Sequence, residues 1–153
     1  MTRKLIYVAS ALFSDAERNE NEMMTSILER WFDVFLPQRD GCLISNLIAE
    51  GMNASEAYSY VFRKDIEAIS ESDAIIINLD GRTVDEGAAF ELGFAFARAK
   101  VCVGYRTDVR VLLPWGLNPM VTVPLETILR SPQELEEWSA MFVMSQIRRV
   151  GTG

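Results

Sequence analysis

The stretch from residue 73 to residue 98 constrains the fold most, because an apolar strand, an acidic turn and an apolar helix follow one another in it. Residues 74–79 (AIIINL) are a continuous apolar run bounded by acids. Such a run is typical of a central strand in a parallel sheet that is covered on both faces. Residues 88–97 (AAFELGFAFA) are apolar on every side of a helix, as in a core helix. They are too few to span a bilayer, which needs about 20 apolar residues.

Glu91 is the only ionisable residue in that apolar helix. An ionised carboxylate in a core is costly unless it is paired, and glutamate is rarely fully buried. The mismatch between Glu91 and its surroundings makes it the first candidate for chemistry. A structural alternative is that Glu91 complements the positive end of the helix dipole.

The remaining elements are predicted from apolar runs and capping signals. Strands are expected over residues 5–9, 74–79, 101–105 and, as a short final strand, 121–123. Helices are expected over residues 14–35, 43–50, 53–72, 86–97 and 131–149. A second strand near the break at 37–41 is either absent or very short. The alternation of strands and helices predicts one α/β domain over residues 1–153, doubly wound and mostly parallel, with helices on both faces.

Ligands of such folds bind beyond the carboxyl ends of the strands. That edge is expected to collect residues 10–13, 80–87 and 106–110. Glu91 lies about one turn into the helix that begins at this edge. The sequence therefore directs attention to the turn before that helix, which contains Asp85.

Composition excludes several kinds of function. The net charge of −7 argues against nucleic acid or an anionic membrane as partner. The chain has no histidine, which excludes Ser-His-Asp and Cys-His catalysis and argues against zinc. We expect no metal and no cofactor. Two cysteines without paired spacing, and an N-terminus without a signal-peptide pattern, lead us to expect a cytoplasmic protein.

Three side chains could together perform chemistry at a sugar carbon. Two carboxylates in different surroundings are the minimum for double displacement, with one attacking C1 and the other handling the leaving group's proton. Glu91, beside an apolar wall, is the better nucleophile, and Asp85, in a turn, can reach the leaving group. Tyr7, on a neighbouring strand, can donate to a carboxylate. Structural alternatives remain: Asp85 as a turn-former and Tyr7 as an ordinary strand residue.

The ordered motifs resemble those of the nucleoside 2-deoxyribosyltransferases. The matching segments run in order over most of the chain, and the pattern DxGxxxExG with an upstream LDG is the most specific. The segments are Ile6-Tyr7 with Phe13, 65–69 (DIEAI), 78–81 (NLDG), 85–93 (DEGAAFELG), 104–108 (GYRTD) and 118–120 (NPM).

The resemblance implies a flavodoxin-like fold and a retaining transfer of 2-deoxyribose between nucleobases. It implies that Glu91 attacks C1′, that Tyr7 hydrogen-bonds this nucleophile, and that Asp65 and Asp85 bind the base and assist its protonation. It further implies substrate contacts by Phe13, by Gly87 in the acidic turn, and by Asn118 and Met120. Asn118 would reach the active site of a neighbouring subunit, so a homodimer or hexamer is expected. The partners would be 2′-deoxynucleosides and free nucleobases.

Departures from the family pattern leave other functions open. The first turn reads Ala9-Ser-Ala11, where the family often has glycines. Because this turn contains no Gly, Lys or Arg, it lacks the residues that usually bind a phosphate. We therefore rank a 2-deoxynucleoside 5′-monophosphate N-glycosidase second to the transferase. A non-catalytic nucleoside-binding domain is a third reading. A receiver domain phosphorylated on Asp80 is disfavoured, because no acid pair follows the first strand.

Overall fold

A single five-stranded sheet organises the protein. The computed structural model describes residues 3–110 and 116–150, with side chains up to residue 145. All strand pairs are parallel, in the order β2-β1-β3-β4-β5, the order of flavodoxin-like folds. The predicted doubly wound fold is confirmed. The strands are β1 (Leu5–Ala9), β2 (Asp33–Phe35), β3 (Ala74–Asn78), β4 (Val101–Tyr105) and β5 (Thr127–Leu129).

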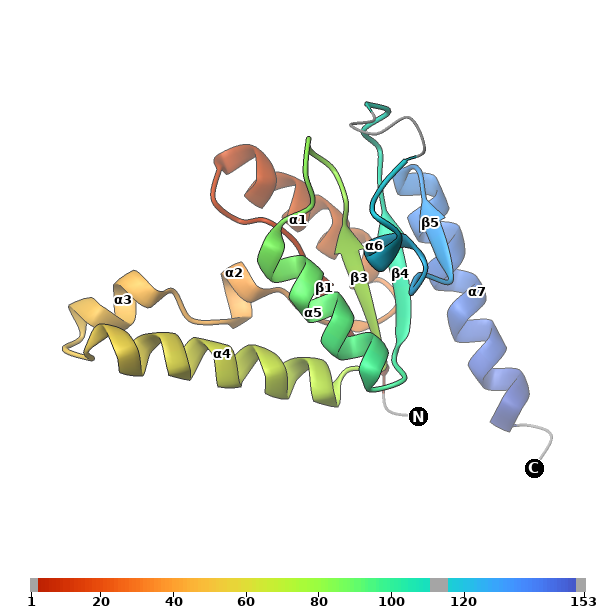
Figure 1. Ribbon diagram of the computed structural model, residues 1–153. Coiled ribbons are helices and arrows are strands. Elements are labelled where there is room, and N and C mark those ends of the chain that lie inside the picture. The colour runs from red at the N-terminus through yellow and green to blue at the C-terminus, as the bar shows by residue number, and fades with distance from the viewer. Residues whose placement is uncertain (1–2, 111–115, 151–153) are drawn as a thin grey trace.

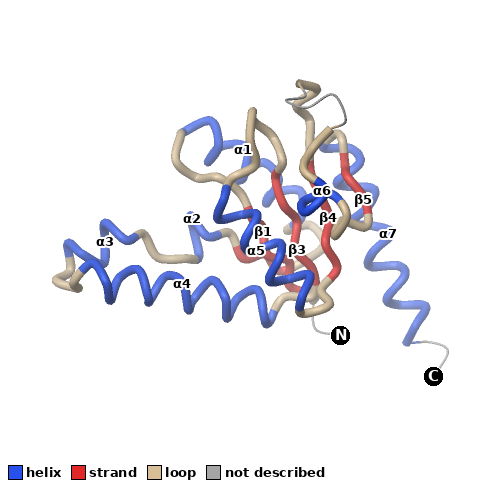
Figure 2. Tube along the Cα trace, in the orientation of Figure 1, coloured by secondary structure: helices blue, strands red, loops and turns tan. Residues whose placement is uncertain are grey.

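Helices cover both faces of this sheet (Figures 1 and 2). Because successive side chains of a strand point to opposite faces, the strands feed two separate cores. Ile6 and Ile76 pack in the core beneath α1 and α7, whereas Tyr7 and Ile75 pack in the core beneath α4 and α5. The helices are α1 (Asp15–Leu28), α2 (Pro37–Asp40), α3 (Ile44–Ala49), α4 (Ala54–Glu71), α5 (Glu86–Ala97), α6 (Pro119–Thr122) and α7 (Pro132–Val150).

Helix α1 begins as predicted but ends earlier. Ser14 caps it with a reciprocal capping box to Glu17. The prediction that it continues to Phe35 is wrong, because the helix ends at Leu28 and residues 33–35 form β2. The Arg3 guanidinium donates to the carbonyls of Glu29 and Phe32 at 2.6 Å each. Arg3 lies just before β1, and its contact satisfies carbonyls at the end of α1. The contact is therefore not visible in the sequence of the helix itself.

The predicted strand over residues 121–123 is also wrong. Asn118 accepts a hydrogen bond from the amide of Met120 at 2.9 Å and begins the short helix α6, with Pro119 at its first position. Asn at the N-cap and Pro at the first position are both strong start signals. The fifth strand is instead Thr127–Leu129, which pairs with β4.

Helix α4 extends well beyond the sheet (Figure 1). Its C-terminal part packs on the sheet through Ala68 and Ile69, and its N-terminal part projects together with α3. Tyr58 and Phe62 on the projecting part are exposed. Among the described helices, none combines the length and the apolar composition that a bilayer-spanning segment needs.

Candidate active site

A hydrogen bond joins β1 to α5 at the centre of the candidate site. The Tyr7 hydroxyl donates to Glu91 Oε1 at 2.8 Å. Tyr7 is fully buried, and Glu91 is partly buried on the second turn of α5. Burial, together with the charges of Glu91 and Asp65, raises the pKa of Tyr7 far above its usual range. The phenol therefore keeps its proton and acts as a donor to the carboxylate.

The carboxyl group of Glu91 is far less acidic than an exposed one. Burial raises its pKa to about 8, the hydrogen bond from Tyr7 opposes this rise, and the charges of Asp65 and Asp85 add to it. Burial also raises the pKa of Asp65, on α4, to about 6, with the Lys64 ammonium opposing. Three acids from α4, the β3–α5 turn and α5 thus share one region, and the raised pKa values of Glu91 and Asp65 are typical of functional sites.

Asp85 is the N-cap residue of α5. Its Oδ2 accepts from the amide of Ala88 at 2.9 Å, so the structural interpretation of Asp85 applies. Capping uses only one carboxylate oxygen, because Oδ1 accepts no hydrogen bond within the described part of the chain. A Cβ at Gly87 would lie 3.2 Å from Asp85 Oδ2. Gly87 therefore leaves room for the carboxylate beside the helix start.

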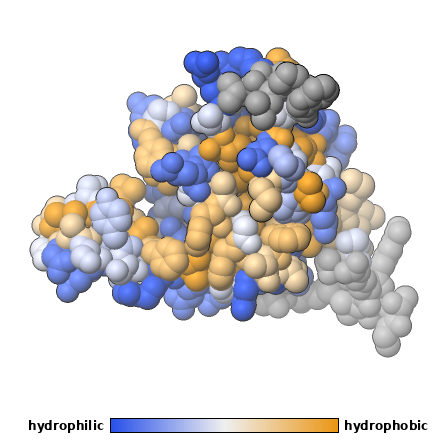
Figure 3. Space-filling view, in the orientation of Figure 1, coloured by the Kyte–Doolittle hydropathy of each residue, from blue (hydrophilic) through white to orange (hydrophobic). Residues whose placement is uncertain are grey.

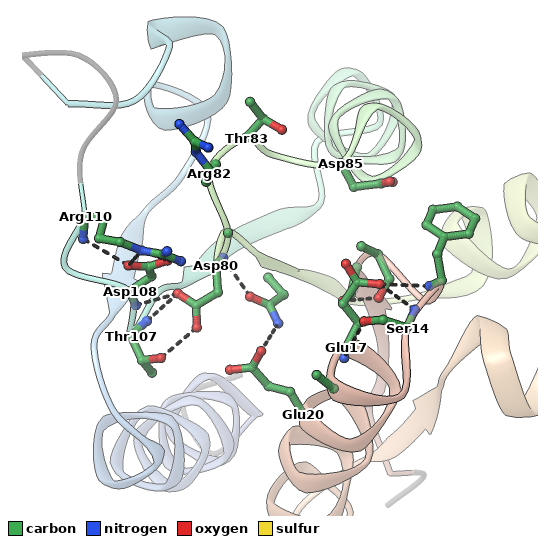
Figure 4. Close-up of a pocket in the computed structure, with 16 residues that line it drawn as sticks. Ser14, Glu17, Glu20, Asp80, Arg82, Thr83, Asp85, Thr107, Asp108 and Arg110 are labelled. Atoms are coloured by element: carbon green, nitrogen blue, oxygen red, sulfur yellow. Dashed lines mark hydrogen bonds and ion pairs between the residues drawn. The ribbon is translucent and has the colours of Figure 1, made fainter.

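An open cavity of about 720 Å³ lies at the carboxyl ends of the strands (Figure 4). The turns after β1 and β3 and the segment after β4 line it, which is the edge predicted to bind a ligand. Two predicted site residues, Phe13 and Asp85, belong to its lining, and Phe13 is largely exposed. Glu91, Tyr7 and Asp65 do not line this cavity. Asp85 therefore lies between the cavity and the group around Glu91.

A hydrogen-bond network that the sequence did not reveal holds one wall of the cavity. Asp80 accepts from the amide and hydroxyl of Thr107 and from the amide of Asp108, each at 2.7 Å. Across from it, burial and the neighbouring Asp80 raise the pKa of Glu20. Asp80 belongs to the NLDG motif, which marked it as notable, but nothing local indicated the role of Glu20 on α1.

Asn118, the N-cap of α6, and Met120, within α6, do not belong to the lining of this cavity. The carboxamide of Asn118 caps α6, and Met120 is 81% exposed. Within the described part of the chain, neither residue bonds to Glu91, Tyr7 or Asp85, and neither lines the cavity. The structure thus does not join these two predicted residues to the site of their own chain.

The described residues contain no cluster of three or more Asp, Glu or Cys side chains that could hold a metal ion. The acids of the site are instead arranged around a tyrosine, a helix amide and an apolar wall. This arrangement suits proton transfer and nucleophilic attack by a carboxylate.

Comparison with known families identifies the chain's relatives. The family model of the nucleoside 2-deoxyribosyltransferases matches residues 6–149. The chain belongs to this family. The match includes β1 with Tyr7, α5 with Glu91, and every element between them.

Three relatives place the chain within the range of the nucleoside 2-deoxyribosyltransferase fold. A conserved protein of Enterococcus faecalis V583 has a TM-score of 0.72 at 25% identity, over 92% of this chain and 99% of that one. The 2-deoxyribosyltransferase of Bacillus psychrosaccharolyticus has a TM-score of 0.72 at 22% identity, over 86% and 90%. The CMP N-glycosidase of Clostridium botulinum has a TM-score of 0.55 at 18% identity, over 91% and 99%.

A protein of Ureaplasma parvum serovar 3, named only as uncharacterized, is 30% identical over 104 residues. The aligned part spans about 65% of the length of each protein. Membership of the nucleoside 2-deoxyribosyltransferase family rests on the family model and not on this partial match.

Proposed function

We propose that the protein transfers 2-deoxyribose between nucleobases through a covalent deoxyribosyl-Glu91 intermediate. The observation that carries this proposal is the hydrogen bond from Tyr7 to Glu91, on a helix whose other side chains between residues 88 and 97 are apolar. A carboxylate held by one donor beside an apolar wall is oriented and poorly solvated. Both properties favour attack on an electrophilic carbon.

The transfer proceeds in two displacements. A Glu91 oxygen attacks C1′, the C1′–N bond breaks with its electron pair on the leaving base, and the base takes a proton from Asp85 or Asp65. In the second step, a nitrogen of the acceptor base attacks C1′, the ester bond to Glu91 breaks, and the acceptor's proton returns to the same acid. Two inversions give retention at C1′. The raised pKa of Asp65 supports its use as a proton donor near neutral pH.

The charge of the cavity favours nucleosides over nucleoside monophosphates as substrates. Its lining contains five acids and two arginines, and one arginine, Arg110, is held by Asp108 through paired hydrogen bonds. A phosphate would meet net negative charge there, whereas phosphate sites are built from backbone amides or clustered cations. This supports the transferase over the monophosphate N-glycosidase. The five acids are Glu17, Glu20, Asp80, Asp85 and Asp108.

We propose further that the active unit is a homodimer or hexamer in which Asn118 and Met120 complete a neighbouring site. Both residues are exposed, Asn118 at the N-cap of α6 and Met120 within it. Exposed apolar side chains, Phe90 and Phe96, lie on the adjacent α5, and Figure 3 shows an apolar band over these two helices. An apolar band of this kind is typical of a surface that another chain covers.

The transfer is tested with 2′-deoxyuridine and adenine as substrates and chromatography of the products. We expect deoxyadenosine and uracil in equal amounts, and none from the Glu91→Ala protein. Without an acceptor base, intact-protein mass spectrometry should detect a deoxyribosyl adduct on the wild type alone. Uracil without deoxyadenosine, or cleavage of 2′-deoxyuridine 5′-monophosphate only, would identify a hydrolase instead. Binding without any turnover would identify a nucleoside-binding domain.

The shared site is tested by mixing two inactive variants, Glu91→Ala and Asn118→Ala. If Asn118 acts across an interface, mixed oligomers contain one site with both wild-type residues and activity returns. Mixtures of each variant with itself are the controls. Activity that stays absent after subunit exchange, verified by sedimentation of differently tagged chains, would place Asn118 in the site of its own chain.

A further inference from the structure

Tyr7 lies in a row of side chains that crosses three strands at one level. In the register of the sheet, Tyr7 pairs with Phe35 on β2 and with Ile75 on β3. Residues directly opposite in neighbouring strands point to the same face. All three side chains accordingly belong to, or pack against, the core beneath α4 and α5. The phenol of Tyr7 is therefore flanked by one side chain from each neighbouring strand.

The contact between Phe35 and Tyr7 is a parallel stack. Their ring centroids lie 5.4 Å apart, and the ring planes differ by only 10°. Strand β2 is three residues long and lies at the edge of the sheet. Its central residue, Val34, packs in the opposite core, and Asp33 is exposed. Phe35 is thus the apolar side chain that this short edge strand gives to the face that carries Tyr7.

A fixed phenol ring matters because the hydroxyl at its tip is the donor to Glu91. The ring can turn only about the Cα–Cβ and Cβ–Cγ bonds, and a stacked partner on one side restricts both rotations. On its other side, Ile75 is fully buried within a five-residue strand. The rigid central strand and the aromatic edge residue together confine the ring.

We propose that Phe35 is a positioning residue for the nucleophile: its ring holds the Tyr7 phenol where the hydroxyl donates to Glu91. The proposal rests on the transfer reaction proposed above. Phe35 itself touches no reacting atom in this role. It acts through Tyr7, and Tyr7 acts through its hydrogen bond of 2.8 Å.

Loss of the stack would change the charge state as well as the orientation of Glu91. The groups that face Glu91 are Tyr7 from β1, Asp65 from α4 and Asp85 at the start of α5. Of these, Tyr7 favours the carboxylate, whereas the two aspartates disfavour it. If the phenol is displaced, nothing opposes the rise in the pKa of Glu91 that the two aspartates and burial cause. Glu91 then binds its proton more tightly.

The kinetic test replaces Phe35 by Leu, which removes the ring but keeps an apolar side chain. We expect kcat for deoxyribosyl transfer to fall roughly ten-fold or more, with KM little changed. The acid limb of the pH profile should move to higher pH. Phe35→Tyr, which keeps the stack, should restore wild-type behaviour. Val34→Ala is the matched control, because it loosens the same strand from the opposite face, and it should leave both properties unchanged.

A double-mutant cycle separates positioning from general loosening. In the Tyr7→Phe protein there is no hydroxyl to place, so adding Phe35→Leu should lower kcat no further. If the fold-losses in kcat of the two single variants multiply in the double variant, the proposal is overturned. Phe35→Met fills similar space without a ring and replaces Phe35→Leu throughout if the latter does not fold.

A titration without substrate keeps the proposal separate from the proposed reaction. In protein with ¹³C-labelled glutamate carboxyl groups, NMR follows the protonation of Glu91, assigned by its loss in Glu91→Gln. We expect Glu91 to titrate at higher pH in Phe35→Leu and at the wild-type pH in Val34→Ala. An unchanged titration in Phe35→Leu would refute the positioning role. Absence of transfer by the wild type would refute only the proposed reaction.

Discussion

Tyr7 and Glu91, 84 residues apart in the sequence, meet through a hydrogen bond of 2.8 Å between the central sheet and helix α5. Tyr7 is fully buried in the sheet, and Glu91 lies in the interior of helix α5 and not at its end. The pair therefore forms only when β1 and α5 are packed together. The same packing that makes the Glu91 carboxyl a poor acid provides the donor that orients it.

We predict that Glu91→Gln stabilises the fold at high pH. The pKa of Glu91 is raised to about 8 in the folded protein, so between its unfolded value and 8 the folded state binds more protons. The contribution of Glu91 to stability is thus fully present below the unfolded pKa and is lost as pH rises through 8. At pH 9 the variant should exceed the wild type by roughly 1–3 kcal/mol. Urea unfolding at pH 5, 7 and 9 measures the difference.

The control for this prediction is Glu86→Gln, an exposed acid at the start of the same helix. Its effect should vary little between pH 5 and 9. A stability difference for Glu91→Gln that is equally independent of pH would contradict the raised pKa.

We predict that Asp65→Asn moves the acid limb of the pH–rate profile to lower pH. The charge of Asp65 helps to raise the pKa of Glu91. Without this charge, the Glu91 carboxylate forms at lower pH, and the inflection of kcat/KM should fall below about 8. The comparison is with Glu67→Gln, which removes an exposed acid from the same helix α4. Equal shifts in the two variants would indicate a general charge effect and not a specific contact.

The fold was predictable where its signals are local. The apolar run of β3 and the capping signals at Ser14, Asn53 and Ser131 identified the central strand and three helices. The end of α1 was missed, because the guanidinium of Arg3, a residue outside that helix, binds the carbonyls beyond it. Strand β2 is too short to have a period of its own, and it exists through pairing with β1.

The candidate site was predictable to a similar extent. Glu91 stood out because a lone acid in an apolar helix violates the local pattern. The neighbours that tune it were less visible: the stack of Phe35 on Tyr7 depends on the register of two strands. Glu20 and Asp80 come close to each other only because α1 packs beside the carboxyl ends of the strands. Such pairs are properties of the sheet and not of any one segment.

We predict that two substitutions of Asp85 separate its two roles. Asp85→Ala removes the cap of the Ala88 amide and should lower stability by about 1 kcal/mol. Asp85→Asn keeps a good N-cap and should unfold close to the wild type. Because asparagine cannot exchange a proton with a base, transfer by Asp85→Asn should fall roughly a hundred-fold. Full activity in Asp85→Asn, with loss only in Asp85→Ala, would reduce Asp85 to a cap.

We predict opposite effects on stability for alanine at two glycines. At Gly104 on β4, a Cβ would lie 2.9 Å from Cδ1 of both Leu79 and Leu125. These side chains must shift, so Gly104→Ala should cost about 1–3 kcal/mol. At Gly93 on α5 there is nothing within 4 Å of an added Cβ, and alanine favours the helix, so Gly93→Ala should stabilise by about 0.5–1 kcal/mol.

Urea unfolding of both variants at one protein concentration measures whether each substitution lowers or raises the free energy of unfolding. The Gly93→Ala result also tests whether another chain covers α5. The space beside Gly93 is empty in the single chain, but a partner subunit could fill it. If Gly93→Ala destabilises the protein, and does so more as oligomers form at higher concentration, the added methyl group meets a partner. Destabilisation that is independent of concentration would contradict the open space around Gly93 within one chain.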